Sequence, residues 1–250
     1  MIYDVKFSIV IVTYNALDYV LVCLETLKKY STLSHEIIVV DNHSKADMVD
    51  YLRSVEGIIL VENEKNRLWA PGNNQGIELA KDRAEFVILM NSDIKILRSD
   101  WLQRLEALAN SEERIGIVGP VWNTFPYKPV YGAVDGCCFM IRSEVIREIG
   151  YLDEKYPWNG AGFIYSMKAL HHSWKSAHYA GPKILHHYGK RSRVENRTML
   201  ENQDIDVQKV MRDYNIKPNF DFAFWLKYRI KSILKAEPKV RLPGIPQTFK

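Results

Sequence analysis

The segment FVILMNSDI at residues 86–94 places the strongest constraint on how this chain folds. Its five leading residues are apolar, and the run ends at Asn91, Ser92 and Asp93. A short apolar run that polar residues close is typical of a strand buried on both faces of a parallel sheet. Open α/β sheets bind ligands at the carboxyl ends of such strands. Asp93 is therefore either a ligand for a hard divalent cation or part of a polar turn that stops the strand.

Strand-like and helix-like segments alternate through the first half of the chain. β-branched apolar runs predict the strands, and apolar residues at helical spacing predict the helices between them. The predicted strands are residues 7–13, 36–40, 57–62, 86–90 and 115–118, and the predicted helices lie within residues 17–27, 47–54, 71–83 and 101–108. Such alternation predicts an α/β fold whose mostly parallel sheet is covered by helices on both faces. Asn15 is predicted to cap the first helix.

Polar residues follow three of the predicted strands. They form the clusters Thr-Tyr-Asn at residues 13–15, Asp-Asn at residues 41–42 and Asn-Ser-Asp at residues 91–93. A parallel sheet brings the carboxyl ends of its strands to one edge. We therefore expect the three clusters to converge on one ligand-binding crevice, rather than to form three unrelated turns.

The composition is that of a globular protein, with 47% hydrophobic residues and a formal charge of +4, which does not indicate a nucleic-acid binder. Its three cysteines, two of them adjacent, do not form a disulfide framework, so we expect a reducing compartment. The first residues lack the pattern of a signal peptide. No apolar run reaches the roughly 18 residues of a membrane span. We expect a cytoplasmic protein whose membrane contacts, if any, are peripheral.

The second half of the chain has a mixed pattern. Residues 134–141 are predicted to form a strand and residues 143–149 and 163–171 helices, which together build the other half of the crevice. Near the C-terminus, residues 222–234 place apolar side chains at helical spacing among basic ones. Such a helix either lies on an anionic membrane surface or packs on the domain or on a second subunit.

Six segments, in this order along the chain, resemble the family 2 glycosyltransferases of the GT-A fold, including their rhamnosyltransferase-like members. They are SIVIVTYN (residues 8–15), IIVVDNHS (37–44), ENEKNRLWAPGNNQGI (62–77), LMNSDI (89–94), DGCCFMIRSEVIREIGYLDEKY (135–156) and ILHHYGKRS (184–192). The resemblance covers residues 6–192. It implies a GT-A domain over residues 1–192. Residues 193–250 are predicted to form a helical C-terminal extension, whose last part is expected to be disordered.

The resemblance implies transfer of a sugar from a nucleoside-diphosphate sugar, with UDP, TDP or GDP as the nucleotide, to a hydroxyl of a saccharide or lipid-linked acceptor. The residues at or next to the family's nucleotide-binding positions are Thr13, Asn15, Asp41, Asn66, Arg67, Asn74 and Asp93. Arg67 stands where the family usually has glycine, and it is either a phosphate contact or a solvated surface charge. By analogy with the family alone, we expect a hexosyltransferase of polysaccharide or glycoconjugate assembly, in the cytoplasm or at the inner face of the membrane.

The resemblance also implies a divalent ion, Mn²⁺ or Mg²⁺, which neutralises the diphosphate leaving group. Asp93 matches the metal-binding Asp-x-Asp position, with Asn91 as the first residue of that motif. His186 is the implied second ligand. It is preferred over His187 because Gly189 and Ser192 then fall at the family's spacing.

An inverting transfer needs a general base, and here the chain departs from the family. The family's Glu-Asp pair aligns with Ala161 and Gly162, and the segment WNGAGFIYSMKA at residues 158–169 contains no carboxylate. Asp135 is the favoured replacement. Other groups on the acceptor side are Asp153, Glu154, His171 and His172. The alternatives are a retaining or acceptor-assisted transfer, and a catalytically silent nucleotide-sugar-binding or scaffold protein.

Overall fold

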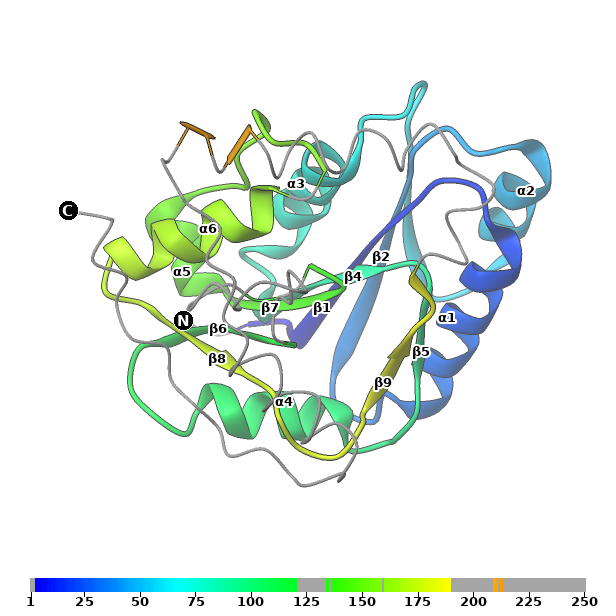
Figure 1. Cartoon of the computed structure of the whole chain (residues 1–250). Helices are drawn as coiled ribbons and strands as arrows, with labels where there is room; N and C mark the ends of the chain where they lie inside the picture. The colour runs from blue at the N-terminus through cyan, green and yellow to red at the C-terminus, as the bar shows by residue number, and fades with distance from the viewer. Residues whose placement is uncertain are drawn as a thin grey trace, which may run out of the picture.

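The computed structural model describes residues 3–120, 134, 136–158, 160–189, 209–210 and 212–213. Helices and strands alternate along most of this part of the chain (Figure 1). The elements are β1 (Val5–Thr13), α1 (Leu17–Tyr30), β2 (His35–Asp41), α2 (Ala46–Ser54), β3 (Ile58–Glu62), α3 (Trp69–Ala80), β4 (Ala84–Asn91), β5 (Ile94–Ile96), α4 (Trp101–Ala109), β6 (Ile115–Gly119), β7 (Cys138–Arg142), α5 (Ser143–Ile149), α6 (Gly160–His171), β8 (Lys175–His178) and β9 (Leu185–His187).

A seven-stranded sheet with the order β3-β2-β1-β4-β7-β6-β8 forms the centre of the molecule. β1 pairs in parallel with β2 and β4, and β2 pairs in parallel with β3. β7 is antiparallel to both of its neighbours, β4 and β6, whereas β6 and β8 are parallel. The predicted α/β fold with a mostly parallel sheet is confirmed.

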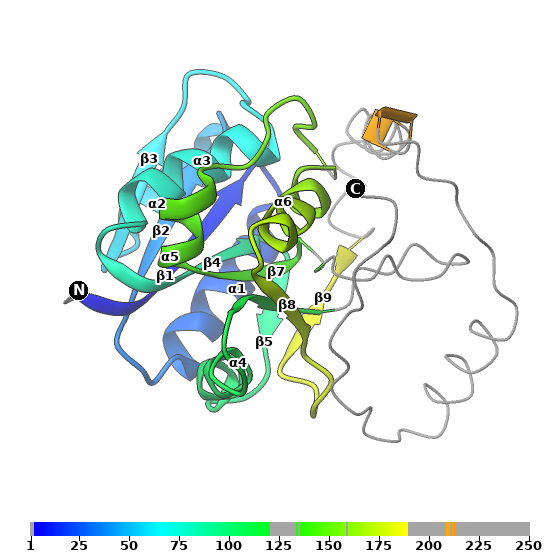
Figure 2. The same ribbon diagram turned by 90° about the vertical axis from the view of Figure 1, so that its left-hand side faces the viewer.

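The uninterrupted apolar run of β4 is explained by burial on both faces of the sheet. Phe86 and Ile88 belong to the core cluster on one face, and Val87 and Leu89 to the cluster on the other face. Successive side chains of a strand point to opposite faces, so both faces demand apolar residues. Residues of α1, α2 and α4 complete the first cluster, and residues of α3, α5 and α6 complete the second. Figure 2 shows α3, α5 and α6 gathered on one side of the sheet, with α1 and α4 on the other.

α3 lies unusually close to β1 because two of its residues have no side chain. A Cβ added to Gly76 would lie 2.2 Å from Cγ1 of Val10, and one added to Gly72 would lie 3.0 Å from Cγ1 of Val12. Glycine is the residue that permits such an approach of a helix to a strand. As a result, the N-terminal end of α3 reaches the carboxyl end of β1, where the crevice is predicted.

A second, two-stranded sheet joins β5 to β9 in antiparallel pairing. Ile94 faces His187, Lys95 faces His186, and the backbone N–H of Leu97 donates to the carbonyl of Ile184 at 2.9 Å. Since β5 begins directly after Asp93, this pairing brings β9 to the carboxyl end of β4.

The long predicted strands are confirmed, and the deviations concern short elements. β7 begins at Cys138 instead of residue 134, and α6 begins at Gly160 instead of residue 163. β5, β8 and β9 were not predicted. Ser192, at the end of the predicted GT-A domain, lies outside the described residues. The same holds for residues 222–234 of the predicted extension. Among the residues that are described, no helix has both the length and the apolar character that a membrane crossing requires.

Candidate functional site

The carboxyl ends of β1, β2 and β4 meet at one edge of the sheet, as the sequence predicts. Thr13 is the register partner of Asp41, and Val12 is the register partner of Asn91. Thr13 and Asp41 are both buried, and the Thr13 hydroxyl donates to Oδ1 of Asp41 at 3.0 Å. The structure therefore brings the polar ends of these three strands into one cluster.

The loop after β1 is tied to the loop after β2 through Asp41. The Ser44 N–H donates to Oδ2 of Asp41 at 3.0 Å, and the Ser44 hydroxyl donates to Oδ1. The Asn15 N–H donates to the Ser44 hydroxyl at 2.8 Å, and the Asn15 side-chain oxygen accepts from the Lys45 N–H at 2.9 Å. Asn15 is thus not the cap of α1, because its side chain serves the neighbouring loop; Ala16 occupies the cap position.

Backbone strain concentrates around this edge of the sheet. Among the described residues, six non-glycine residues have a positive φ, and four of them lie in the loops after β1 and β2 or directly before α3. These four are Asn15 (φ 56°), Ala16 (57°), His43 (66°) and Leu68 (73°). Each such conformation costs on the order of 1–3 kcal/mol and persists where the surrounding structure imposes it, often at a functional site.

A chain of side-chain amides holds the segment before α3. The Asn42 amide donates to the Leu68 carbonyl at 3.1 Å and accepts from the Asn63 amide at 3.0 Å. The Asn63 and Gln75 amides exchange two hydrogen bonds at 2.9 Å. The Asn66 side-chain oxygen accepts from the Leu68 N–H at 2.8 Å. Asn42 and Asn66 thus bond to the carbonyl and the N–H of Leu68, the residue with the positive φ.

The remaining predicted nucleotide residues divide into two groups. Arg67 is exposed next to the amide chain. Asn74 lies elsewhere, because its amide donates to the Leu152 carbonyl at 3.0 Å and to Oε1 of Glu154 at 2.9 Å, and its oxygen accepts from the Leu152 N–H at 3.0 Å. The structure thus uses Asn74 to fasten the turn before α6 to α3, and does not bring it together with Thr13 and Asp41.

The structure places His187, and not His186, next to Asp93. Nε2 of His187 lies 3.3 Å from Oδ1 of Asp93 and 3.4 Å from Nδ2 of Asn91. His186 instead has Nδ1 at 3.2 Å from Nζ of Lys183. Adjacent residues of a strand point to opposite sides, so only one of the two histidines can face Asp93. The preference for His186 came from motif spacing, which does not fix the side of the strand.

The donors around Asp93 suit a divalent cation. Asp93 is 6% exposed, and its carboxylate, the His187 imidazole and the Asn91 amide lie together. Carboxylate oxygen with imidazole nitrogen is a ligand set for Mn²⁺-type ions, and Mg²⁺-type sites in phosphate chemistry use one or two protein ligands. Within the described part of the chain no group of three or more His, Cys, Asp or Glu side chains forms a closed metal site. Asp93 and His187 could supply two protein ligands to such an ion.

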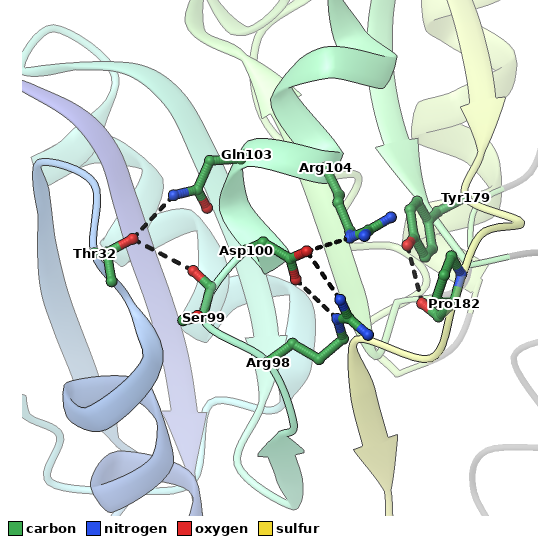
Figure 3. A network of polar contacts seen from close by, with 8 residues as sticks. All are labelled: Thr32, Arg98, Ser99, Asp100, Gln103, Arg104, Tyr179 and Pro182. Atoms are coloured by element: carbon green, nitrogen blue, oxygen red, sulfur yellow. Dashed lines mark hydrogen bonds and ion pairs between the residues drawn. The ribbon is translucent and has the colours of Figure 1, made fainter.

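A network of ion pairs lies at the turn between β5 and α4, beside the segment that leads to β9 (Figure 3). Asp100 pairs with Arg98 at 2.9 Å and with Arg104 at 2.8 Å, and the Tyr179 hydroxyl donates to the Pro182 carbonyl at 2.9 Å. The hydrogen bond from Arg98, followed by that from Arg104, lowers the pKa of Asp100 far below its usual value. The network anchors the turn between β5 and α4 beside the connection from β8 to β9.

The acceptor side offers no carboxylate at the position that the family alignment indicates. Ala161 is completely buried, and a Cβ added to Gly162 would lie 3.7 Å from Phe139 and 3.9 Å from Trp69. Aromatic rings thus surround the position of the family's Glu-Asp pair. Asp135, the favoured base, lies outside the described residues.

The other base candidates are engaged elsewhere. His171 ends α6, about 14 Å along the helix from Gly162 at a rise of about 1.5 Å per residue. His172 lies 3.3 Å from Glu148. Oδ1 of Asp153 accepts the Lys155 N–H at 2.9 Å. His172 and Asp153 therefore make local contacts with Glu148 and Lys155.

A carboxylate that the sequence analysis did not single out lies near the start of α6. Asp213 contacts the Tyr156 hydroxyl and Nζ of Lys155, each at 2.9 Å, and the hydrogen bonds from Lys155 and Tyr156 lower its pKa to about 2. Val210 packs in a cluster with Tyr156 and Phe163. Tyr156 and Phe163 are buried core residues. Nothing in the sequence near residue 213 indicates this contact, because it depends on the tertiary fold.

The fold and this edge of the sheet define a GT-A protein, the class of nucleotide-sugar-dependent transferases. The family model for glycosyl transferase family 2 matches residues 8–135, and the chain belongs to this family. This confirms the resemblance found in the sequence.

Relatives and solved structures agree with this assignment. The amylovoran biosynthesis glycosyltransferase AmsB of Erwinia amylovora is 26% identical over 61% of this chain and 60% of its own length. The uncharacterized protein y4gI of Sinorhizobium fredii is 30% identical over 45% of this chain and 13% of its own length. The chain thus spans less than two thirds of the length of these relatives.

Two solved structures share the fold. The mannosyltransferase PcManGT from Pyrobaculum calidifontis, in complex with GDP-Man and Mn²⁺, superposes with a TM-score of 0.61 at 17% identity, covering 92% of this chain and 70% of that chain. TarS of S. aureus, in complex with UDP, gives a TM-score of 0.57 at 15% identity, covering 92% of this chain and 72% of that chain. At these identities the likeness establishes the fold.

Proposed function

We propose that this chain transfers a sugar from a nucleoside-diphosphate sugar to an acceptor hydroxyl, with a divalent ion held by Asp93 and His187. The observation that supports this most directly is the 3.3 Å contact between the Asp93 carboxylate and Nε2 of His187, beside the cluster of Thr13 and Asp41. When bound, Mn²⁺ or Mg²⁺ would neutralise the diphosphate leaving group.

The residues of the chain divide the remaining work. Asp41, held by Thr13 and Ser44, would receive the base or ribose of the nucleotide. The strained loop at Asn15 and Ala16 would already hold its conformation before the donor arrives. Arg67, exposed beside Asn66, is available for a phosphate. Asp135 stays the proposed base.

The donor, acceptor and setting are proposals by analogy. PcManGT was solved with GDP-Man and TarS with UDP. We therefore consider GDP and UDP, together with TDP, as candidates for the nucleotide of the donor. AmsB is an amylovoran biosynthesis glycosyltransferase, which favours a role in polysaccharide assembly with a saccharide or lipid-linked acceptor. We propose a cytoplasmic location, with membrane or dimer contacts through the C-terminal helix.

Titration calorimetry of UDP, GDP and TDP, with and without Mn²⁺, tests the proposal. We expect one nucleotide to bind in a metal-dependent manner and Asp93→Ala to abolish this binding. Asp82→Ala is the matched control, because Asp82 is an exposed carboxylate just before the opposite end of β4. Absence of nucleotide binding by the folded wild type would refute the proposal. Metal-dependent binding without product from a labelled donor would indicate a catalytically silent protein instead.

A further inference from the structure

Trp69, the first residue of α3, has one end of its indole beside the proposed metal pair. The indole Nε1–H donates to Oδ1 of Asn91 at 3.3 Å. Asn91 ends β4, two residues before Asp93, and its Nδ2 lies 3.4 Å from Nε2 of His187. The five-membered part of the indole therefore lies at the end of the site where the ion and the diphosphate would be held.

The six-membered part of the same indole lies against the start of α6. A Cβ added to Gly162 would lie 3.9 Å from Cη2 of Trp69, and one added to Gly136 would lie 3.2 Å from Cζ2. Gly162 stands at the position of the family's missing Glu-Asp pair, where an acceptor hydroxyl would be activated. One flat ring system thus reaches from the metal motif to the acceptor side of the site.

The backbone on both sides of Trp69 is held by hydrogen bonds. On one side the Leu68 carbonyl accepts from the Asn42 amide at 3.1 Å, and on the other the Ala70 N–H donates to the Pro157 carbonyl at 2.9 Å. The indole is bonded through Nε1 as well, so its place does not depend on a ligand. A binding group that is positioned in advance loses less conformational freedom when the ligand arrives.

The protein covers the indole only in part. Trp69 is half-buried, because it packs against the core cluster of β4, β7 and α6 while part of its surface stays exposed. In the proposed reaction, the anomeric carbon of the sugar is bonded to the diphosphate and is attacked by the acceptor oxygen, so the sugar must lie between these two groups. The indole spans the same interval. An aromatic ring offers flat apolar area of defined geometry, which matches the face of a sugar ring that carries C–H groups.

We propose that Trp69 is a specificity-determining residue of the sugar subsite, whose indole packs against the C–H face of the sugar that is transferred. The proposal rests on the proposed function, because it takes the ligand to be a nucleoside-diphosphate sugar. It adds a claim that the proposed function does not contain: Trp69 contributes to binding of the sugar and not to binding of the nucleotide.

Titration calorimetry of the full-length chain with Mn²⁺ separates the two contributions. The probes are UDP, GDP and TDP, and their conjugates UDP-glucose, UDP-N-acetylglucosamine, GDP-mannose and TDP-rhamnose. We expect Trp69→Leu to weaken binding of the preferred conjugate about 10-fold more than binding of its free nucleotide. Trp69→Phe should change this ratio less than about 3-fold. Both variants lose the hydrogen bond to Asn91, so their difference isolates the aromatic face. Equal losses for nucleotide and conjugate in Trp69→Leu, or equal ratios in the two variants, would overturn the proposal.

A second pair of variants moves the indole without removing it. A methyl group at Gly136 would press on the ring, whereas one at Gly162 would make an ordinary contact. Gly136→Ala should therefore weaken conjugate binding, relative to nucleotide binding, more than Gly162→Ala does, and the reverse order would contradict the proposal. Binding of a nucleotide by the wild type without any of its conjugates would refute the sugar platform alone. If the wild type binds no nucleotide, the proposed function fails and this proposal fails with it.

Discussion

Nε2 of His187 and Oδ1 of Asp93 lie 3.3 Å apart, although they belong to segments far apart in the chain. The antiparallel pairing of β5 with β9 brings them together. The geometry of the proposed metal site therefore depends on the pairing of β9 with β5.

The choice between the two histidines can be tested directly. We expect His187→Ala to reduce Mn²⁺ affinity at least about 10-fold, because it removes one of the two side chains proposed to bind the ion directly. His186→Ala should change the affinity less than about 3-fold, because His186 lies on the other side of β9, against Lys183. Electron paramagnetic resonance titration measures both. A larger loss in His186→Ala would favour the interpretation from motif spacing over the structure.

The Leu68→Gly variant of the protein should be more stable than the Leu68→Ala variant. Its φ of 73° favours glycine, and relief of such strain is worth on the order of 1–3 kcal/mol, against about 0.5–1 kcal/mol for the greater freedom of unfolded glycine. Both variants remove the leucine side chain, so their difference isolates the backbone. We expect the free energy of unfolding, measured by urea denaturation, to be about 1 kcal/mol higher for Leu68→Gly than for Leu68→Ala. Alanine equal to or better than glycine would show that Leu68 is not strained.

Restoring the family's carboxylates should not restore a base. Ala161 is completely buried and Gly162 lies against Phe139 and Trp69. Burial of an unpaired charge destabilises a protein by several kcal/mol. We expect Ala161→Glu to lower the unfolding temperature and to give no gain in product formation. The conservative Ala161→Ser serves as the control for size, and a gain in activity by the glutamate variant would contradict this expectation.

Asp213 should make the stability of the chain depend on acidic pH. Its pKa falls from 3.8 to about 2 on folding because Lys155 and Tyr156 donate to it. A lowered pKa contributes stability above the unfolded value, and this contribution is lost as the pH falls through the folded value. The unfolding temperature of Asp213→Asn should therefore lie below that of the wild type above about pH 4. The difference should shrink between pH 4 and 2, and a difference independent of pH would argue against the contact.

The predictability of the fold differed between long and short strands. β1, β2 and β4 are recognisable because each run is long enough to show burial on both faces. β5 and β9 have three residues each and β8 has four, too few to show a period of two. Their existence depends on partners distant in the chain.

The site divides in the same way. Thr13, Asp41 and Asp93 follow from strand ends and from the family motifs. The position of His187 required the register of β9, which residue spacing does not describe.

The pairing of β5 with β9 has a consequence for how the protein is made. Asp93 and the carboxyl ends of β1 and β2 leave the ribosome long before residues 185–187. In the proposed metal site, the carboxylate alone would bind an ion weakly during that interval, and the imidazole would complete the site only when β9 pairs with β5. Tight binding of Mn²⁺ would thus report that the sheet region has finished folding, which makes the ion a usable probe of completed chains against truncated ones.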